Sequence, residues 1–288
     1  MKKILAAIVT YNPDLERLQK NINAIEPQVE HLIIVDNGSK NINLISRIKA
    51  ECKIKIDLIE NKENIGIASA LNQALDYAYK NNFDWILTLD QDSICDINMI
   101  SEMKSQYEKE DNKNIALIAP NILDENITLK PQDIKEGIEY TGPVITSGSL
   151  TKTNIAKNID GFVDKLFIDQ VDFDFCLRLK DSGADILKVN RAIIYHQLGE
   201  ISEHKLFGKT ITTTNHSPIR RYYYYRNLVY MYEHYKENHK EWINLEIKHA
   251  IKNIPRIILF EKNKTDQIKS ITKGILDAKK GKYGQFKK

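Results

Sequence analysis

The chain has 288 residues, of which 42% are hydrophobic and 28% are charged, and its net charge is +3 at pH 7. This length and composition fit a soluble protein with one α/β domain and an appendage, or with two modest domains. Since no apolar run approaches the ~20 residues that span a bilayer, the sequence excludes a helical integral membrane protein.

Strands and helices are predicted to alternate over the first third of the chain. Apolar and β-branched runs predict buried strands at Ile4–Val9, Leu32–Val35, Ile54–Ile59 and Phe83–Leu89. Apolar residues at helical spacing predict helices between them, at Leu15–Ile25, Ile42–Ile48 and Ile67–Tyr79. This alternation is typical of a mainly parallel, doubly wound sheet, in which ligands bind beyond the carboxyl ends of the strands.

The periodicity weakens after this region. A helix is predicted over Met99–Tyr107 and a buried strand over Ile115–Pro120, whereas residues 121–141 are polar and are expected to be rich in loops. A strand with a glycine break is predicted at Val144–Leu150. Two further short strands are expected at Asp185–Val189 and Ala192–Tyr195.

An acid-polar-acid sequence, Asp90-Gln91-Asp92, directly follows the fourth predicted strand. Two carboxylates at positions i and i+2 can reach the same small volume if the backbone bends there. Mg²⁺ and Mn²⁺ prefer such oxygen ligands, often together with substrate phosphates. The alternative is a polar strand end at which aspartate forms a turn.

Asp36 ends the second predicted strand and opens the turn Asp36-Asn37-Gly38-Ser39. A carboxylate at this place can accept a hydrogen bond from the N3–H group of uracil or thymine, which cytosine lacks. The alternative is an Asx turn that caps the strand. A dinucleotide is not expected, because Thr10-Tyr11-Asn12-Pro13 follows the first strand in place of a glycine-rich phosphate loop.

A second acidic cluster contains Asp169, Asp172 and Asp174, in an apolar segment with helical spacing from Val171 onward. Asp169 and Asp172 share one face at the predicted helix start, where the helix dipole favours anions. A carboxylate placed in a cleft could act as a general base toward a hydroxyl. Capping of the helix by Asp169 would explain part of the cluster without any chemistry.

Three arginines, Arg220, Arg221 and Arg226, lie among four consecutive tyrosines. The guanidinium fork suits phosphate oxygens, and aromatic rings can stack on a sugar or base. Some of the tyrosines are expected in the core, because helical spacing continues to Tyr235. One short basic and aromatic cluster is thin support for nucleic acid binding, so no nucleic acid partner is expected.

The C-terminal segment is strongly basic. From Lys248 onward there are 12 Lys and Arg and 3 Asp and Glu, a balance of +9 that leaves −6 for the rest of the chain. Apolar residues between Ile254 and Leu276 recur at helical spacing among these lysines, which is typical of an amphipathic helix at an anionic membrane surface. The alternatives are a solvated chain end, or a helix whose apolar face packs on the body of the protein.

With these pieces placed, the chain resembles the family 2 glycosyltransferases of the GT-A fold, and within them the bacterial rhamnosyltransferases of cell-surface polysaccharide synthesis. The resemblance extends from the first strand to about residue 227. It rests on motifs that occur in order at Val9–Asn12, Val35–Ser39, Asn64–Gly66 with Asn72, Asp90–Ser93 and Val171–Arg178, and it is extended by His196 with Gly199 and by Arg220–Asn227.

This resemblance implies a role for each matching residue. The pyrimidine base would be bound by Asp36 with Thr10, Tyr11 and Asn12 beside it. The remainder of the nucleotide sugar would contact Asn64, Gly66, Asn72, Asp90, Gln91, Arg220, Arg221 and Arg226. A Mn²⁺ or Mg²⁺ ion would be held by Asp90, Asp92 and His196.

The catalytic base implied by the resemblance is Asp172 or Asp174. The family usually carries a glutamate before its catalytic aspartate, and this chain has Val171 there, so Asp169 also stays a candidate. The usual second acid of the turn after the second strand is Asn37 here.

The implied activity is inverting, metal-dependent sugar transfer from dTDP-rhamnose or a UDP-sugar to a hydroxyl of a lipid-linked or polysaccharide acceptor. The transferase domain is expected over residues 1–215. A basic, helical extension over 216–288 is expected to contact a membrane surface or, in a homodimer, a second copy of the chain. A catalytically silent scaffold that binds sugar or lipid beside other transferases is the alternative, although the intact D-x-D argues against it.

The expected location is the cytoplasm, peripherally at the inner face of the cell membrane. Cys52, Cys95 and Cys176 lack the spacing of a metal site and are expected to be reduced thiols.

Overall fold

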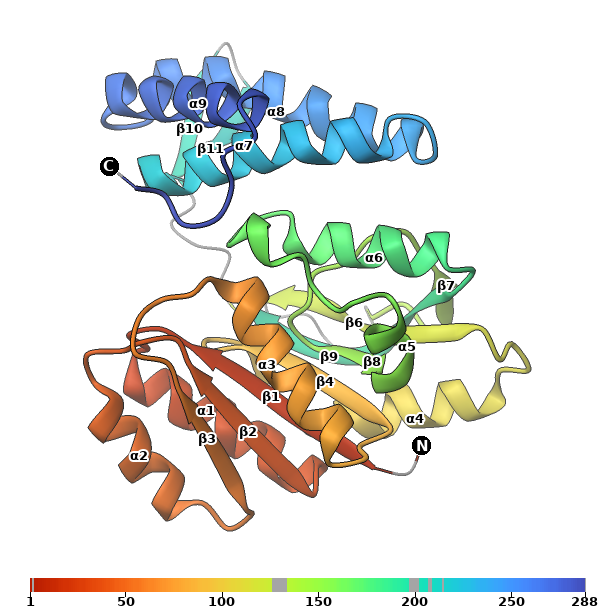
Figure 1. Ribbon diagram of the computed structural model, residues 1–288. Coiled ribbons are helices and arrows are strands. Elements are labelled where there is room, and N and C mark those ends of the chain that lie inside the picture. Colours follow the sequence, from red (N-terminus) through yellow and green to blue (C-terminus); the bar gives the residue numbers. More distant parts are fainter. Residues whose placement is uncertain (2, 126–133, 197–201, 207–208, 214, 288) are drawn as a thin grey trace. The chain divides into compact units, whose positions relative to one another are not determined.

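The computed structural model describes residues 1, 3–125, 134–196, 202–206, 209–213 and 215–287 (Figure 1). By their internal contacts, the residues fall into two compact units. The first comprises Met1–Val163 with Asp172–Gln197, and the second comprises Asp164–Val171 with Leu198–Lys288. Each unit has its own sheet. The division into domains at residue 215 stays a prediction.

A nine-stranded sheet forms the centre of the first unit, in the order β3-β2-β1-β4-β8-β6-β9-β5, with β7 paired to β9. Its parallel part contains β1 (Ile4–Thr10), β2 (His31–Asp36), β3 (Ile56–Glu60) and β4 (Trp85–Asp90). All seven residues of β1 are buried, as expected for a central strand that is covered on both faces. Because these four strands are parallel, their carboxyl ends meet at one edge of the sheet.

The other part of the sheet mixes strand directions. It contains β5 (Ile94–Cys95), β6 (Ile115–Asp124), β7 (Ile138–Tyr140), β8 (Ser149–Lys152) and β9 (Asp185–His196). Strand β8 runs antiparallel to β4 and β6, β6 runs parallel to β9, and β5 and β7 run antiparallel to β9. The predicted class, an α/β fold with a mainly parallel sheet flanked by helices, is confirmed.

Helices cover both faces of this sheet, and α3 crosses in front of β1 and β4 in Figure 1. Helix α1 shows why the sequence folds in this way: the Asp14 side chain caps its start by accepting a hydrogen bond from the backbone N–H of Arg17 (2.8 Å), and its apolar stripe is buried. The helices are α1 (Leu15–Ile25), α2 (Ile42–Glu51), α3 (Ile67–Lys80), α4 (Met99–Lys109), α5 (Thr153–Asn158) and α6 (Val171–Asp181).

Several predicted boundaries were wrong beyond residue 115. Strand β6 continues to Asp124, and β7 lies within the segment expected to be loop, of which residues 126–133 are outside the described part. The strand predicted from Val144 begins only at Ser149. The reason is Gly148, whose φ of +81° interrupts the extended backbone and whose added Cβ would lie 2.6 Å from Pro120. The two short strands expected near residue 190 form the single strand β9.

The second unit contains a two-stranded hairpin, β10 (Ser202–Leu206) and β11 (Lys209–Thr213), which was not predicted, and three long helices. These are α7 (Pro218–Tyr235), α8 (Lys240–Phe260) and α9 (Lys264–Lys279). The Ser217 side chain caps α7, and Pro218 occupies its first turn. Gly274 allows α9 to approach α7, since an added Cβ would lie 2.4 Å from the Tyr222 carbonyl oxygen.

The predicted amphipathic stretch from Ile254 to Leu276 is divided between two helices. Helix α8 ends at Phe260, and α9 begins after Asn263, whose φ of +53° turns the chain. As predicted, several tyrosines of α7 lie in the core of this unit, among them Tyr222, Tyr223 and Tyr225.

Candidate active site

Polar residues converge at the carboxyl ends of three strands in the first unit. In the sheet register, Thr10 of β1 pairs with Asp36 of β2, and Val9 pairs with Asp90 of β4. Strand ends that are far apart in the sequence therefore open at the same rim. Since α/β sheets bind ligands at this edge, the rim is the candidate active site.

Asp36 is only 1% exposed, and its side chain forms hydrogen bonds to the end of β1 and to the turn after β2. Its Oδ2 accepts hydrogen bonds from the backbone N–H groups of Gly38 (3.1 Å) and Ser39 (2.8 Å), which forms the Asx turn weighed from the sequence. Its Oδ1 accepts a hydrogen bond from the Thr10 hydroxyl (2.9 Å) and retains a second lone pair. Recognition of a base by Asp36 stays a prediction.

Two asparagines hold the loop after β3 against the turn after β2. The Asn37 amide donates to Asn64 Oδ1 (3.1 Å), and Asn37 Oδ1 accepts from the Ile65 backbone (3.0 Å). Asn64 Oδ1 also accepts from the N–H of Gly66 (2.9 Å). Gly38 has no room for a side chain, because an added Cβ would lie 2.7 Å from the Glu63 carbonyl carbon. Asn64 and Gly66 therefore belong to the hydrogen-bonded loop that packs against the turn after β2 at the rim.

The segment after β1 joins the same network. The N–H of Tyr11 donates to Gln91 Oε1 (2.8 Å), which links the ends of β1 and β4. The N–H of Asn12 donates to the Ser39 hydroxyl (2.7 Å), and Asn12 Oδ1 accepts from the N–H of Lys40 (2.9 Å). The Tyr11 ring is 48% exposed and is available to a ligand at the rim.

Asp90, Asp92 and His196 offer one ligand atom each, and these three atoms lie within 4.8 Å of one another. His196 lies at the end of β9. Strand β5, which follows the Asp90-Gln91-Asp92 turn, pairs with β9 with Ile94 opposite Tyr195, and this pairing brings His196 beside the turn. Asp92 Oδ1 lies 3.9 Å from His196 Nδ1. The structure thus brings together the three residues that the sequence predicted as metal ligands.

Two buried serines support this cluster. The Ser93 hydroxyl lies 3.1 Å from His196 Nδ1 and 2.7 Å from the Ser147 hydroxyl. Ser147 in turn accepts a hydrogen bond from the N–H of Asp90 (3.0 Å). The supporting role of Ser147 was missed, because its partners lie more than fifty residues away in the chain; its position beside the glycine break was the signal available.

The donor set fits a divalent cation. Two carboxylates with one imidazole suit Mn²⁺, and carboxylates with phosphate oxygens suit Mg²⁺. The three residues are partly exposed, so a ligand can complete the coordination from solvent.

The two aspartates at the start of α6 have different surroundings. Asp174 is fully buried, and its Oδ2 accepts a hydrogen bond from Arg178 Nε (2.8 Å) in an ion pair. The Arg178 guanidinium also donates to the carbonyls of Ile159 and Gly161. Asp172 is partly exposed in the first helical turn. This geometry favours a structural role for Asp174 and makes Asp172 the better candidate for a base, and both assignments stay predictions.

The side chain of Asn72, on α3, forms two hydrogen bonds to the backbone of Phe162, one as donor and one as acceptor. Its amide nitrogen donates to the Phe162 carbonyl (2.7 Å), and its Oδ1 accepts from the Phe162 N–H (2.8 Å). It therefore holds the turn after α5, and its predicted contact with a nucleotide sugar gains no support from this position.

The three arginines predicted near the diphosphate lie on α7, in the second unit. Arg221 is buried in an ion pair with Glu261 (2.7 Å). Arg226 is 1% exposed and donates to the carbonyls of Gly284 (2.6 Å) and Leu166 (2.8 Å). Both guanidinium groups are thus engaged within the protein, which does not favour phosphate binding, whereas Arg220 is exposed.

Asp169, the remaining candidate base, also belongs to the second unit. Its carboxylate lies 3.4 Å from Arg220 Nε. Burial raises the pKa of Asp169, and the nearby charge of Arg220 opposes this shift. The backbone of Phe167, Asp169 and Gln170 is left-handed, with φ of 64–65°, and the Asn227 amide fastens the carbonyls of this segment. These contacts indicate an anchored loop.

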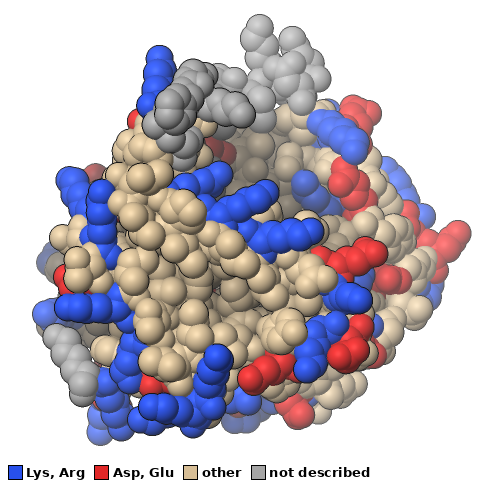
Figure 2. Space-filling view, turned by 90° about the horizontal axis from the view of Figure 1, so that it is seen from above, with Lys and Arg blue, Asp and Glu red and all other residues tan. Residues whose placement is uncertain are grey.

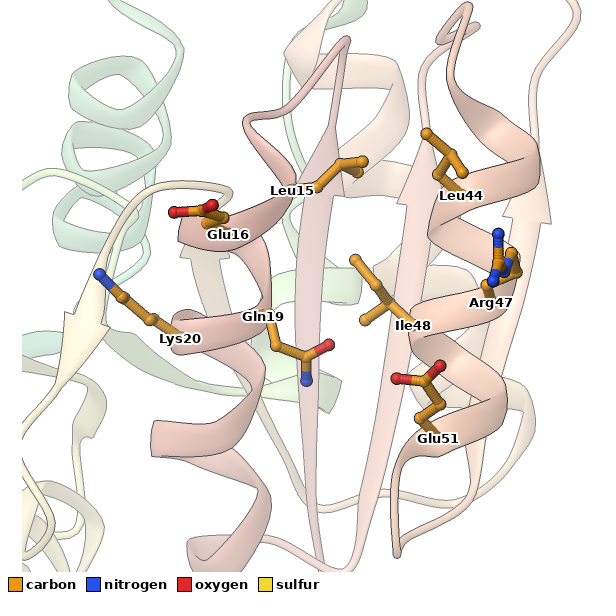
Figure 3. Close-up of a pocket in the computed structure, with 8 residues that line it drawn as sticks. All are labelled: Leu15, Glu16, Gln19, Lys20, Leu44, Arg47, Ile48 and Glu51. Atoms are coloured by element: carbon orange, nitrogen blue, oxygen red, sulfur yellow. The ribbon is translucent and has the colours of Figure 1, made fainter.

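A separate hollow lies between α1 and α2 (Figure 3). It has a volume of about 480 Å³ and is lined mainly by the aliphatic parts of Leu15, Leu44 and Ile48, with charged residues at its margin. None of the predicted site residues lines it. It is therefore distinct from the rim that carries the candidate active site.

A mixed α/β sheet whose carboxyl rim carries an acid-x-acid turn and a histidine is the arrangement expected of the GT-A class of sugar-transferring enzymes. The family model described as glycosyl transferase family 2 matches residues 6–162, more than half of the chain. The chain therefore belongs to glycosyl transferase family 2, and it is a glycosyltransferase.

Known relatives agree with this assignment. The dTDP-rhamnosyl transferase RfbF of Shigella flexneri is 28% identical over an aligned length of 299 residues. The alignment covers 98% of this chain and 97% of that protein. The structure of S. aureus TarS 1-349 in complex with UDP-GlcNAc is similar with a TM-score of 0.62 at 14% identity, covering 96% of this chain and 81% of that one.

The structure of GalNAc-T7 with UDP, GalNAc and Mn²⁺ is similar with a TM-score of 0.61 at 14% identity. The match covers 84% of this chain, which spans about half (49%) of that structure. At these identities the structural likeness shows the fold.

Proposed function

We propose that the protein is a metal-dependent, inverting glycosyltransferase that moves rhamnose from a dTDP-activated donor, or a related sugar from a UDP donor, to an acceptor hydroxyl. The similarity to RfbF along nearly the full length of both chains supports a thymidine nucleotide donor. The observation that carries the proposal is the cluster of Asp90, Asp92 and His196 at the carboxyl rim.

These three side chains would hold the cation, Mn²⁺ or Mg²⁺. When bound, such a cation neutralises the negative charge that develops on a nucleoside diphosphate as it leaves. The Ser93 hydroxyl, 3.1 Å from His196 Nδ1, orients the imidazole toward the cluster.

Asp36 and the segment from Thr10 to Asn12 would bind the pyrimidine. The free lone pair of Asp36 Oδ1 can accept the N3–H of thymine or uracil, and cytosine has no proton there to donate. The exposed Tyr11 ring provides a surface on which the base can stack.

Asp172 would accept the proton of the acceptor hydroxyl. It is the partly exposed acid of the α6 start, whereas Asp174 is neutralised by Arg178. A hydroxyl that attacks the anomeric carbon from the face opposite to the diphosphate inverts its configuration in a single displacement. The proposed acceptor is a lipid-linked or polysaccharide sugar.

The nucleotide preference gives a direct test. Thermal unfolding of the protein is measured with Mn²⁺ and with dTDP, UDP, GDP or CDP. We expect dTDP or UDP to raise the Tm most. Preferential stabilisation by GDP or CDP would contradict the role of Asp36.

Transfer itself is tested with labelled dTDP-rhamnose and a cell extract that contains the acceptor. Asp92→Ala is compared with the wild type, and Asp111→Ala is the control because Asp111 is an exposed acid outside the rim. Nucleotide binding without turnover of any donor would favour a silent sugar-binding scaffold.

A further inference from the structure

Helix α8 of the second unit has one buried side and one long exposed side. The buried side consists of Ile243, Ala250 and Ile257, which recur every seven residues. The exposed side carries four large apolar residues whose exposure lies between 47% and 60%: Leu245, Ile251, Ile258 and Leu259. Exposed apolar side chains are ordinary when single, but four on one helix side mark an interaction surface.

Three cations are interleaved with these apolar residues. Lys248, Lys252 and Arg256 are spaced four residues apart, so they follow one line along the exposed side. The sequence from Ile247 to Phe260 contains no acidic residue. Figure 2 shows lysine and arginine side chains among uncharged surface on the face that it draws. We call the four exposed apolar residues and the three cations together the α8 face.

The charge of the α8 face decides which partner fits it. A second copy of the chain would bring two rows of cations together, and the face offers no carboxylate to pair with them. An anionic phospholipid surface matches both components, because apolar side chains enter the boundary of the acyl chains while lysines and arginines remain among the anionic headgroups.

The helix would lie on the surface of a bilayer and would not cross it. Among the residues that the structure describes, no helix is long and apolar enough to span a membrane. From Leu245 to Leu259 the α8 face is about 21 Å long, at 1.5 Å per residue. An interfacial helix of this length, with cations beside its exposed apolar residues, suits reversible membrane attachment.

We propose that the α8 face binds the surface of an anionic phospholipid bilayer. This surface differs from the one predicted from the sequence, since it ends at Leu259 and excludes α9. The inference concerns where the enzyme acts and does not depend on which nucleotide sugar it uses. It agrees with the proposed lipid-linked acceptor, which a membrane-bound enzyme would meet at high local concentration.

The test is flotation of the full chain with vesicles of phosphatidylcholine, with and without phosphatidylglycerol. We expect binding only to the anionic vesicles, weakening as salt is raised. The triple variant Lys248→Gln, Lys252→Gln, Arg256→Gln should bind on the order of a hundredfold more weakly, because each cation near an anionic surface contributes about a factor of five.

A second variant separates the apolar contribution from the charge. Ile251→Ser, Ile258→Ser, Leu259→Ser should lose binding while its Tm stays close to that of the wild type, since these side chains are exposed. The matched control is Lys80→Gln, Lys109→Gln, Lys113→Gln, which removes the same charge from exposed positions of the first unit and should bind normally.

The proposal would be overturned if the charge variant and the control bind anionic vesicles equally well. It would also be overturned if the wild type binds pure phosphatidylcholine vesicles as strongly as anionic ones. Light scattering tests for the alternative partner, a second copy of the chain. That partner would be indicated if the wild type is a dimer, the serine variant is a monomer and neither protein binds vesicles. Nucleotide-dependent Tm shifts are recorded in parallel, so failure of the membrane proposal is distinguishable from failure of the transferase proposal.

Discussion

The Thr10 hydroxyl donates a 2.9 Å hydrogen bond to Asp36 Oδ1, and the two residues are direct neighbours at the ends of β1 and β2. Both are buried, so the bond is shielded from water. Thr10→Val keeps the shape but removes the donor. We expect a loss of about 1–2 kcal/mol of unfolding free energy and weaker dTDP binding, as measured by urea unfolding and calorimetry. Thr10→Ser restores a hydroxyl and should recover both. Unchanged stability and dTDP affinity of the valine variant would show that the bond is dispensable.

The aspartates of α6 should respond differently to substitution. Asp172→Asn is expected to lower kcat on the order of 10²–10⁴-fold while the affinity for the nucleotide and the Tm change little, as for loss of a general base. Asp174→Ala leaves Arg178 without its carboxylate and should destabilise the fold by about 3 kcal/mol. Kinetics and thermal unfolding of the two variants, measured side by side, check this division. Loss of kcat in a stably folded Asp174 variant would instead make Asp174 the base.

Asn227 is expected to be important for the stability of the second unit. Its buried amide nitrogen lies 2.8 Å from each of the carbonyl oxygens of Leu166, Ile168 and Asp169. Asn227→Ala leaves these carbonyls without that donor, and we expect a loss of roughly 2–3 kcal/mol. Asn244→Ala, at an exposed position of α8, serves as the control. Equal urea midpoints for the two variants would refute the anchoring role.

Acid should destabilise the second unit through His216. Burial, with the charges of Arg220 and Arg221, lowers the pKa of His216 to about 4 from its ordinary value of 6.5. The unfolded state therefore binds a proton between these values while the folded state does not, so stability is complete above pH 6.5 and falls as the pH drops toward 4. The loss is roughly 2 kcal/mol after allowance for partial exposure. Urea unfolding at several pH values should show a shallower decline for His216→Gln, and an unchanged decline would contradict the assignment.

Local sequence signals predicted the rim well. Asp90 and Asp92 are two residues apart at a strand end, so their proximity follows from one turn. The alternation of strands and helices predicted which strand ends share an edge. His196 was assigned through the family resemblance, and the structure brings it to the acids through the pairing of β5 with β9.

Roles set by distant partners were not predictable in this way. Arg226 has the same chemistry as a phosphate ligand, but its carbonyl partners lie about sixty residues away in both directions. Asp174 and Arg178 are one helical turn apart, but the burial of Asp174, which favours a structural role for the pair, could not be read from the sequence. The β10–β11 hairpin has no strong alternation of apolar and polar residues from which it could be predicted.

We propose above that Asp90, Asp92 and His196 bind a divalent cation together with the nucleotide diphosphate. The most direct measurement is the electron paramagnetic resonance signal of free Mn²⁺, titrated with protein in the presence and absence of dTDP. We predict that the wild type removes Mn²⁺ from solution more strongly with dTDP than without it, that Asp92→Ala loses this effect, and that Asp111→Ala retains it. Mn²⁺ binding that is identical in the wild type and in Asp92→Ala would contradict the account.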